Sequence, residues 1–347
     1  MAGRAADGRS TLADVARAAG VSTATVSKTL NGRQDVAAST REKVLAAVAS
    51  LGYRSSTQPS PESARRAVAV VFDIPASPYI LNVFQGVLAA ATEAGLDLIT
   101  RLAPDKQGRR QRSTAHAWVS DQADSGVVGI VGLTLSAPDA LLDAAADANL
   151  PFVMVDPVDT QHRRMVSVGS SNWAGARAAT DHLIGLGHRR IGWIGGPEAS
   201  IAARDRLYGY RAALDAAHLE VDAALMRTGS FDVASGEIYG RELLALPDPP
   251  TAIMAGDDEI AVGVLAAARI LGVPVPERLS VVGFDDTPQA AWTTPPLTTV
   301  HQHLDGMGRM AVQTVVAMSG GTRPASRHVE LATSLTLRDT TAPPPPH

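Results

Sequence analysis

The stretch TLADVARAAGVSTATVSKTLN, residues 11–31, decides the fold of the N-terminal part of the chain. Its apolar residues recur at helical spacing in two short runs on either side of Gly20. Thr11, with Asp14 three positions later, predicts a capping box at the start of the first helix. Gly20 predicts the end of that helix, because glycine adopts a positive φ without strain. Two helices joined by so short a turn are typical of the helix-turn-helix, whose second helix enters the major groove of DNA.

A second and a third helix are predicted downstream of Gly20. Ser22 can cap a helix from Thr23 to about Leu30, and the glycine of the Asn31-Gly32 pair predicts a turn after it. Ser39 and Glu42 form a second capping-box pattern. The helix that begins there has a periodic apolar face, made of Val44, Leu45, Val48 and Leu51.

The outward face of the second helix carries small and polar side chains, so this helix can approach base edges closely. The Lys28 ammonium can donate to guanine O6 and N7, and the methyl groups of Thr23 and Ala24 can contact a thymine methyl. The hydroxyl of Ser22 and the nearby backbone amides suit phosphates. A solvated helical hairpin in an unrelated domain is the alternative that the pattern leaves open.

The stretch from Thr11 to Asn31 and the run STREKVLAAVASLGYR from Ser39 to Arg54 resemble, without gaps, the headpiece of the LacI/GalR family of repressors. The resemblance implies a DNA-binding headpiece at residues 9–55. It also implies that three residues of the second helix read bases, namely Thr23, Ala24 and Lys28. The residues expected to contact the DNA backbone or to support the helix are Thr11, Ser22, Thr25, Ser27, Asn31 and Tyr53.

Residues 56–66 are expected to link the headpiece to the rest of the chain, and here the sequence departs from the family. The family carries a leucine that wedges into the minor groove, whereas the corresponding position in this chain falls near Glu62. A carboxylate is repelled by phosphates and cannot act as an apolar wedge. Pro59 and Pro61 also interrupt a helix. Three alternatives stay open: an extended linker, a short helix after Pro61 that brings two arginines to phosphates, or an operator that is bent less.

Composition and charge limit the class of protein. The chain has 347 residues, 45% hydrophobic and 19% charged, which predicts several folded domains. Residues 1–55 hold eight basic and four acidic residues, whereas the remainder holds 23 basic and 31 acidic, so only the N-terminal part is expected to touch nucleic acid. The absence of cysteine excludes disulfides and thiolate metal sites and fits the reducing cytoplasm, the expected location. No apolar run approaches the ~20 residues that span a bilayer, and no signal peptide is seen.

Strand and helix patterns alternate from Ala67 onward, which predicts an α/β body with doubly wound parallel sheets. The predicted strands cover residues 67–72, 96–99, 126–131, 151–155, 190–194, 251–254, 279–282 and 328–331. The predicted helices cover residues 79–94, 138–148, 174–186, 204–218, 234–244, 260–271 and 304–318. The alternation is too long for one five-stranded unit, so it favours two lobes with a ligand in the cleft between them.

The expected architecture is therefore a small all-α helix-turn-helix domain followed by a two-lobed body that resembles periplasmic binding proteins. The body, an effector-binding and dimerisation domain, is expected at residues 67–339. Its two lobes are expected at about 67–166 plus 304–331 and about 167–300 plus 332–339. The proline-rich end, residues 340–347, predicts a disordered tail.

Acidic residues follow several predicted strands, at the edge of the sheets where ligands bind. The candidate carboxylates are Asp73, Asp156, Asp257 and Asp285. Arg204, at the start of a helix, is the candidate arginine, since carboxylates and a bidentate arginine can bind sugar hydroxyls. The candidate aromatic residues for an apolar sugar face are Tyr79, Phe231 and Trp292. For Asp258 and Asp286, which also follow strands, helix capping is the favoured interpretation.

The body resembles the same family nearly throughout, in runs such as SNWAGARAATDHLIGLGHRRIGWIGGP (Ser171 to Pro197) and AGDDEIAVG (Ala255 to Gly263). The resemblance implies an effector cleft lined by Asp156, Ser200, Arg204, Phe231, Asp257 and Asp285. Many relatives carry asparagine at the position of Asp257, so its carboxylate favours a neutral or cationic ligand over an anion.

The whole chain thus predicts a transcriptional repressor that binds an imperfectly palindromic operator as a homodimer, under allosteric control by a small molecule, expected to be a carbohydrate. An enzyme is disfavoured, because neither a nucleophile elbow nor a dinucleotide fingerprint is present. No metal or other cofactor is expected, since His301 and His303 lack helical metal-ligand spacing. A transport binding protein would explain the body but not the headpiece. Dimer or tetramer, and release or promotion of DNA binding by the effector, stay open.

Overall fold

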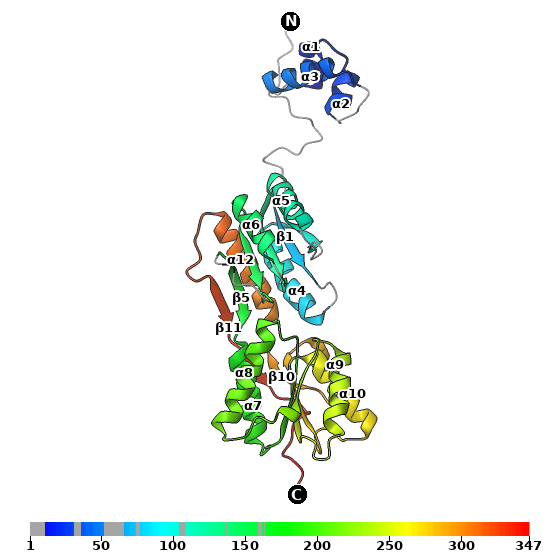
Figure 1. Cartoon of the computed structure of the whole chain (residues 1–347). Coiled ribbons are helices and arrows are strands. Elements are labelled where there is room, and N and C mark those ends of the chain that lie inside the picture. Colours follow the sequence, from blue (N-terminus) through cyan, green and yellow to red (C-terminus); the bar gives the residue numbers. More distant parts are fainter. Residues whose placement is uncertain are drawn as a thin grey trace. The chain divides into compact units, whose positions relative to one another are not determined.

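The computed structural model describes residues 11–30, 36–51, 66–73, 77–103, 109–136, 138–158, 162 and 164–346. The chain divides into two compact units, Met1–Ala64 and Arg65–His347. We call them the headpiece and the body (Figure 1). Of the linker predicted at residues 56–66, residues 56–65 lie outside the described residues, so its three alternatives stay open.

Three helices form the described part of the headpiece: α1 Leu12–Ala19, α2 Thr23–Leu30 and α3 Ala38–Leu51. The predicted capping box is confirmed, since the Asp14 amide donates to Thr11 Oγ1 at 3.3 Å and the Thr11 amide donates to Asp14 Oδ2 at 2.9 Å. Gly20 ends α1 with a φ of 66°, as predicted. One fully buried valine from each helix forms the centre of the core, namely Val15, Val26 and Val44.

The third helix differs from its prediction in two respects. The amides of Thr40 and Arg41 donate to the Ala37 carbonyl, so α3 begins before Ser39 and the predicted cap at Ser39 is wrong. The predicted apolar face is also only partly buried, because 49% of Leu45 and 36% of the last residue, Leu51, are exposed. A domain of three short helices has too small a core to cover every periodic leucine.

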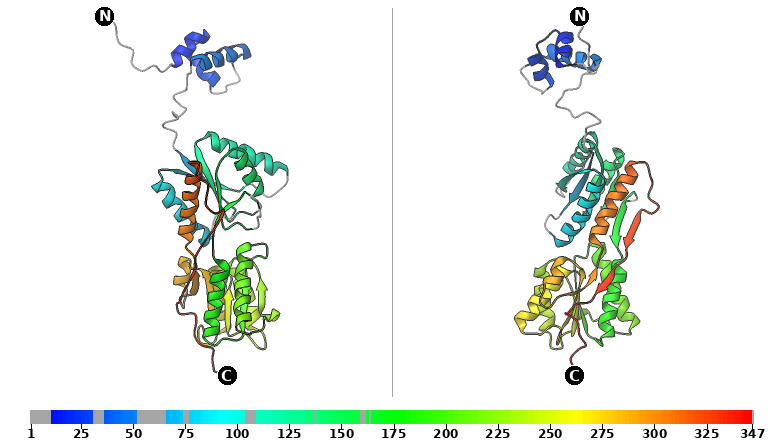
Figure 2. Two further views of the ribbon diagram at one scale, coloured as in Figure 1. Left: turned by 90° about the vertical axis from the view of Figure 1, so that its left-hand side faces the viewer. Right: turned by 180° about the vertical axis from the view of Figure 1, so that it is seen from behind.

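The first lobe of the body is built on six parallel strands in the order β11-β5-β4-β3-β1-β2. The strands are β1 Ala67–Phe72, β2 Asp97–Leu102, β3 Val127–Leu133, β4 Phe152–Val155, β5 Val166–Ser170 and β11 His328–Leu331. One face of the sheet packs on α4 Pro78–Glu93 and α12 Leu304–Ser319, and the other on α5 Arg109–Asp124 and α6 Asp139–Asp147 (Figure 2). The central strands are continuous apolar runs because helices cover both of their faces.

The second lobe has the same plan, with strand order β12-β10-β9-β8-β6-β7. Its strands are β6 Ile191–Gly195, β7 Met226–Thr228, β8 Ala252–Ala255, β9 Ser280–Asp285, β10 Thr298–His301 and β12 Ser334–Thr336, of which only β12 is antiparallel to its neighbour. One face packs on α7 Asn172–Gly185 and α8 Ile201–Ala216, and the other on α9 Val233–Leu244 and α10 Asp258–Leu271. Two short helices, η1 Ala223–Leu225 and α11 Pro288–Trp292, complete the lobe.

The chain passes between the lobes three times, and we call these passages the crossovers. They lie at Ser171, at residues 302–303 and at residues 332–333. The Ser171 amide donates to the Leu331 carbonyl at 3.0 Å, which joins the first crossover to the residue that precedes the third. Because β5 pairs within the first sheet, the first lobe extends to Ser170, four residues beyond the boundary expected at about 166.

Pairs of helices in both lobes approach each other through glycine. A Cβ at Gly86 of α4 would overlap the Asp305 carbonyl oxygen of α12, and a Cβ at Gly308 would overlap the Val83 carbonyl oxygen. Gly236 of α9 meets the Ile260 carbonyl of α10 in the same way. Backbone therefore packs directly on backbone at these crossings, which leaves no room for a side chain.

The C-terminal segment is not the disordered tail that its prolines predict. Thr340 is fully buried, and its hydroxyl donates to the Val281 carbonyl at 2.7 Å and accepts from the Thr298 amide at 2.9 Å. The Ala342 amide donates to Ser280 Oγ at 3.0 Å. The prediction therefore fails for residues 340–342, because these hydrogen bonds attach the segment to β9 and β10.

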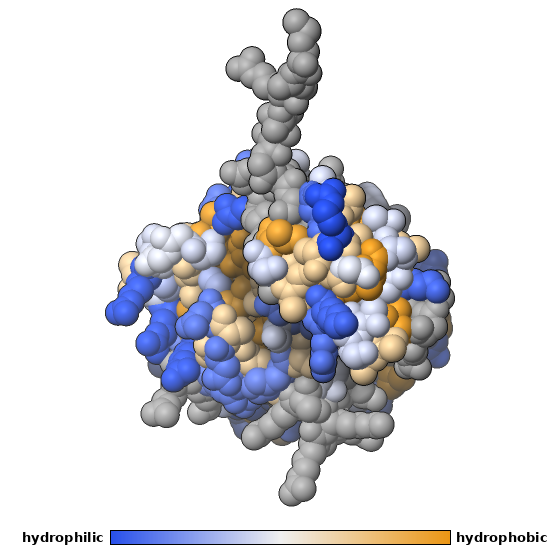
Figure 3. Space-filling model, turned by 90° about the horizontal axis from the view of Figure 1, so that it is seen from above, coloured by the Kyte–Doolittle hydropathy of each residue, from blue (hydrophilic) through white to orange (hydrophobic). Residues whose placement is uncertain are grey.

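Several elements were not predicted, and α5 is the longest of them. The other missing elements are the short strands β5, β7, β10 and β12 and the short helices η1 and α11. In the ranges that the structure describes, no helix is long and apolar enough to cross a membrane. Hydrophilic side chains and smaller apolar patches are interspersed over the face shown in Figure 3.

Candidate functional site

The outer face of α2 carries small and polar side chains, as predicted. Thr23, Ala24 and Lys28 are exposed, whereas Val26 and Thr29 face the core of the headpiece. Small side chains at the start of α2 allow its backbone to come close to a base edge. The structure therefore places the three predicted base-reading residues on one exposed helix face.

The other predicted DNA residues have local partners or lie outside the described ranges. Ser22 Oγ accepts the Thr25 amide at 3.2 Å and lies 2.9 Å from the Thr25 hydroxyl, so Ser22 caps α2 as predicted. The Thr11 hydroxyl donates to Asp14 Oδ2 at 2.6 Å, and this bond is the main reason why the pKa of Asp14 is lowered. Ser27, a residue of α2, is half-buried, while Asn31 and Tyr53 lie outside the described residues.

Two of the predicted effector residues meet in the first lobe. Asp156 follows β4, Tyr79 stands in the first turn of α4, and the Tyr79 hydroxyl donates to Asp156 Oδ2 at 2.5 Å. Burial raises the pKa of Asp156, against the hydrogen bond from Tyr79 and the charge of Arg206 in the second lobe. Asp73, which follows β1, accepts hydrogen bonds from the Ser136 amide at 2.8 Å and the Ser136 hydroxyl at 2.9 Å.

Arg206, on α8, is the buried arginine of the second lobe. Its Nη2 lies 3.3 Å from Asp285 Oδ1, and its Nε and Nη1 donate at 2.7 Å to Asn172 Oδ1 and to the Gly256 carbonyl. The guanidinium carbon lies 3.9 Å from the ring centroid of Phe284, which belongs to β9. Arg206 is therefore held in place by three elements and by an aromatic face.

The prediction of Arg204 as the arginine of the effector site is wrong by two residues. Arg204 is exposed on α8, whereas Arg206 lies in phase with the buried residues Ala203 and Tyr210. Ser200 accepts the Ala203 amide at 3.3 Å and so caps α8, which fixes the start of the helix. The 3.6-residue period counted from that cap would have identified Arg206.

Phe231 completes the surroundings of Arg206. Its ring centroid lies 5.7 Å from the Arg206 guanidinium carbon, and a Cβ at Gly196 would overlap the ring. Gly196 therefore lets the ring lie against the backbone that follows β6. Phe231, which was predicted as an aromatic effector residue, thus lies next to Arg206.

Carboxyl groups crowd the carboxyl ends of β8 and β9. Asp257 caps α10 by accepting the Ile260 amide at 2.8 Å, and burial raises its pKa well above the usual range, with a further rise from Asp285. Burial also raises the pKa of Asp285 to about 6, although Arg206 and a 2.5 Å hydrogen bond from Gln302 Nε2 oppose the rise. We call the group made of Arg206, Tyr79, Asp156, Asp257 and Asp285 the carboxylate cluster.

Asp258 lies behind the carboxylate cluster and is fully paired. Its Oδ2 accepts the Thr287 amide at 2.7 Å and the Thr287 hydroxyl at 3.0 Å, and its Oδ1 accepts the Thr299 hydroxyl at 2.5 Å. Burial, followed by the charge of Asp285, raises its pKa to about 8. The favoured interpretation of Asp258 as a helix cap is wrong, because Asp257 caps α10 and the carboxylate of Asp258 holds the turn after Asp285 instead.

As the pH rises from about 4 to about 8, Asp258 is expected to lower the free energy of unfolding of the body. Over this range the folded protein keeps a proton on Asp258 that the unfolded chain has lost. This contribution is fully present below the unfolded-state pKa and is lost as the pH rises through the folded-state pKa. Asp258→Asn should remove a slope of at most about 1.4 kcal/mol per pH unit. Urea unfolding of both proteins at about pH 5.5 and about pH 8.5 measures this difference, and equal slopes would contradict it.

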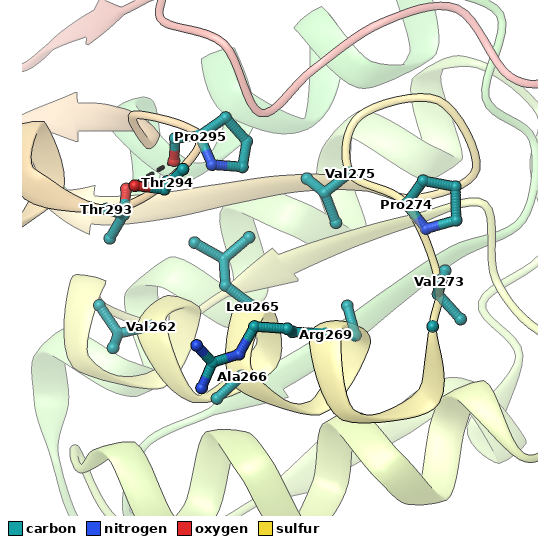
Figure 4. Close-up of a pocket in the computed structure, with 12 residues that line it drawn as sticks. Val262, Leu265, Ala266, Arg269, Val273, Pro274, Val275, Thr293, Thr294 and Pro295 are labelled. Carbon is teal, nitrogen blue, oxygen red and sulfur yellow. Dashed lines mark hydrogen bonds between the residues drawn. The ribbon is translucent and has the colours of Figure 1, made fainter.

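The structure does not bring Trp292 to the carboxylate cluster. Its side chain is 74% exposed at the end of α11, and the next three residues line a surface groove of about 650 Å³ (Figure 4). The opposite wall of the groove consists of α10 and the segment after it, including Leu265, Arg269 and residues 273–275. Trp292 thus directly precedes the lining of this groove in sequence, and we call the groove the α10 groove.

Besides Arg206, two polar residues of the site were not predicted. Asn172 accepts the hydrogen bond from Arg206, and Gln302 donates to Asp285. Asn172 follows the first crossover and Gln302 stands in the second, and neither carries a charge that would have singled it out. Within the described residues, no group of three His, Asp or Glu side chains is arranged to hold a metal ion.

Comparison with known proteins places both parts of the chain. Residues 11–56 match the family model of bacterial regulatory proteins of the lacI family, and residues 180–341 match a periplasmic binding protein-like domain. The HTH-type transcriptional regulator CelR of Thermobifida fusca is 33% identical over 339 residues, 95% of this chain and 98% of the relative. The ribose operon repressor of Escherichia coli K12 is 32% identical over 310 residues, 88% of this chain and 92% of the relative.

Solved structures agree with this assignment. A complex of the transcriptional regulator CelR with cellobiose has a TM-score of 0.70 at 33% identity and covers 96% of this chain and 100% of its own. The lac repressor dimer bound to operator and the anti-inducer ONPF has a TM-score of 0.71 at 28% identity and covers 96% of this chain and 99% of its own. The predicted fold class and family resemblance are thereby confirmed.

Proposed function

Because the chain belongs to the lacI family of bacterial regulatory proteins, we propose that it is a transcriptional repressor whose operator affinity is controlled by a carbohydrate bound between the two lobes. The observation that carries the proposal is the presence, in one chain, of a helix-turn-helix and of a buried carboxylate cluster around Arg206. The relatives are regulators rather than enzymes, which supports binding without catalysis.

The DNA-binding part of the proposal rests on α2. Replacement of Lys28 by alanine is expected to weaken operator binding and to relax the preference at one base pair, by about 1–3 kcal/mol of discrimination. Lys43→Ala, an exposed lysine of α3, is the matched control for the loss of one positive charge. Fluorescence anisotropy with the operator and with single-base variants measures both effects. Unchanged affinity and unchanged base preference in Lys28→Ala would remove this residue from the base-reading set.

The effector-binding part rests on the chemistry of the cluster. The carboxyl groups of Asp156, Asp257 and Asp285 accept hydrogen bonds from hydroxyl groups, and the Arg206 guanidinium donates to hydroxyl or ring oxygens. The ring of Phe231 can contact the apolar face of a pyranose or furanose. Three carboxyl groups face one arginine, so a neutral polyol is favoured over a phosphorylated sugar.

The two parts communicate if the ligand binds both lobes. Tyr79 and Asp156 belong to the first lobe, whereas Arg206 and Asp285 belong to the second. The Ile201 amide at the start of α8 also donates to the Val158 carbonyl of the first lobe at 3.0 Å. A ligand that contacts both sets would favour one relative position of the lobes, and the typical coupling for such linkage is about 1–3 kcal/mol.

A homodimer is the form in which two headpieces read a palindrome. Leu81 and Leu88, one heptad apart on α4, are 54% and 49% exposed, and Leu102 at the edge strand β2 is 54% exposed. In the second lobe, Ile270, Leu271 and Trp292 are exposed beside the α10 groove. Apolar side chains exposed on both lobes support an interface that covers them.

The double variant Leu81→Asp/Leu88→Asp is expected to shift the protein from dimer to monomer and to lower operator affinity at least ~100-fold, because one headpiece then binds alone. Sedimentation velocity measures the first effect and anisotropy the second. Glu93→Gln, an exposed change on the same helix, should leave the dimer intact. A double variant that sediments as a dimer would place the interface elsewhere.

The proposal as a whole is tested with purified full-length protein and DNA from upstream of its own gene, at fixed salt. The saccharide panel includes cellobiose and ribose, because one similar structure is a complex with cellobiose and one relative is the ribose operon repressor. Protection of an imperfect palindrome, with an affinity that one sugar changes ~10-fold or more, is the expected result. Absence of specific protection with and without every sugar would overturn the proposal.

A further inference from the structure

The carboxylate cluster is hydrogen-bonded to the crossovers. Arg206 donates to Asn172, the residue after the first crossover at Ser171. Gln302, in the second crossover, donates to Asp285 through its side chain at 2.5 Å and through its amide to the Asp285 carbonyl at 3.3 Å. The cluster and two of the three crossovers therefore cannot move independently.

Asp286 supplies the third connection. Its Oδ2 accepts the Thr336 hydroxyl at 3.2 Å and lies 3.0 Å from His301 Nδ1, while its Oδ1 lies 2.5 Å from Arg338 Nη2. Thr336 and Arg338 follow the third crossover, and His301 precedes the second. The side chain of Asp286 is only 13% exposed, so these partners surround it.

The backbone links Asp285 and Asp286 rigidly. Both residues have positive φ values, 111° for Asp285 and 56° for Asp286, which are uncommon for residues other than glycine. Asp258 holds the following residue, Thr287, through its amide and its hydroxyl. A turn that is strained and clamped in this way transmits a displacement of Asp285 to Asp286 rather than absorbing it.

We propose that Asp286 transmits occupancy of the effector site to the crossovers, so that ligand contact at Asp285 changes the relative position of the lobes through Thr336, Arg338 and His301. This inference rests on the proposed function and adds a residue that couples the site to the lobes without touching the ligand. The favoured interpretation of Asp286 as a helix cap gives way to this role, since α11 shows no side-chain cap.

The test separates ligand binding from its consequence. Asp286→Asn removes the charge that holds Arg338 and His301 but keeps the size of the side chain. We expect its sugar affinity and its operator affinity without sugar to stay within ~3-fold of wild type, while the effect of saturating sugar on operator affinity falls at least ~5-fold towards none. The probe is the sugar of the panel that shifts wild-type operator binding most, followed by isothermal titration and anisotropy.

Glu242→Gln is the matched control, because it breaks another arginine–carboxylate pair of the second lobe, with Arg227 at 2.7 Å, away from the crossovers. Thr336→Val and Arg338→Gln remove partners singly, and each should reduce the sugar effect without loss of folding. Wild-type coupling in Asp286→Asn, Thr336→Val and Arg338→Gln would overturn the inference, as would equal loss of coupling in Glu242→Gln. Loss of sugar binding in Asp286→Asn would make it part of the site instead. A wild-type protein without any sugar effect would overturn the proposed function itself, which is a distinct outcome.

Discussion

Replacement of Arg206 by alanine is expected to lower sugar affinity at least ~100-fold and to destabilise the body by about 3–5 kcal/mol, because it leaves a buried carboxylate without its counter-ion. Asp285 loses its ion pair with Arg206, and Asn172 Oδ1 and the Gly256 carbonyl lose the hydrogen bonds that Arg206 donates. Urea unfolding measures the free energy of unfolding, and isothermal titration measures sugar affinity. Arg206→Lys keeps the charge but not the fork of donors, so it should recover part of the stability and little of the affinity.

Arg204→Ala is the decisive control for this prediction. Arg204 stands two residues earlier on the same helix and is exposed, so its loss should change stability by less than about 0.5 kcal/mol and leave sugar binding and the effect of sugar on operator affinity intact. The two variants therefore separate the structural assignment from the sequence-based one. Loss of sugar binding in Arg204→Ala with retention in Arg206→Ala would reverse the assignment.

Replacement of Gly86 by alanine is expected to destabilise the first lobe by about 3 kcal/mol. In most helices this change stabilises by about 0.5–1 kcal/mol, because alanine loses less backbone entropy. Here the new methyl group would overlap the carbonyl group of Asp305, which is backbone and cannot rotate away. The helices α4 and α12 would have to separate, and the reciprocal contact of Gly308 with Val83 would separate with them.

Gly185→Ala provides the opposite expectation for the same chemical change. Gly185 ends α7, has no neighbouring atom within 4 Å of the added Cβ, and does not have a positive φ. It should stabilise by up to about 1 kcal/mol or have no effect. Thermal and urea unfolding of both variants measure the difference in sign. A neutral Gly86→Ala variant would mean that α4 and α12 can move apart freely.

Local signals explain what could be predicted from the sequence. The boundaries of α1 and α2 are marked by Thr11, Gly20 and Ser22, whose effects depend on neighbours within four residues. The buried strands are marked by apolar runs. The carboxylates Asp156, Asp257 and Asp285 stand at strand ends, and such positions are determined by the alternation alone. These predictions from short-range patterns agree with the structure, whereas the capping box predicted from Ser39 and Glu42 does not.

Elements without such signals were missed. The helix α5 is strongly polar, begins with the run Arg109-Arg110-Gln111-Arg112 and lacks an acidic first turn, so neither periodicity nor capping marks it. The strands β7 and β12 have only three residues each, too few for an alternation to be seen. The burial of Thr340 depends on partners about 40 and 60 residues away, which no local pattern contains.

In the candidate site, too, the residues whose partners are distant in sequence were interpreted wrongly. Asp286 and Asp258 were interpreted as helix caps because each follows a strand, and their partners Thr336, Arg338 and Thr299 are distant in sequence. Arg204 was predicted instead of Arg206, although both lie on α8. The prediction considered where the helix begins but not which of its faces is buried. Counting the helical period from a capping residue is therefore the step that would have improved the prediction most.

The three crossovers determine the order in which the ribosome can complete the lobes. The helix α4 ends at Glu93, but α12, which covers the same face of the first sheet, begins only at Leu304. Synthesis of the first lobe begins first, but this face of its sheet stays uncovered while α7 to β10 of the second lobe emerge. We therefore expect nascent chains of this protein to be prone to aggregation through that apolar face until α12 has left the exit tunnel.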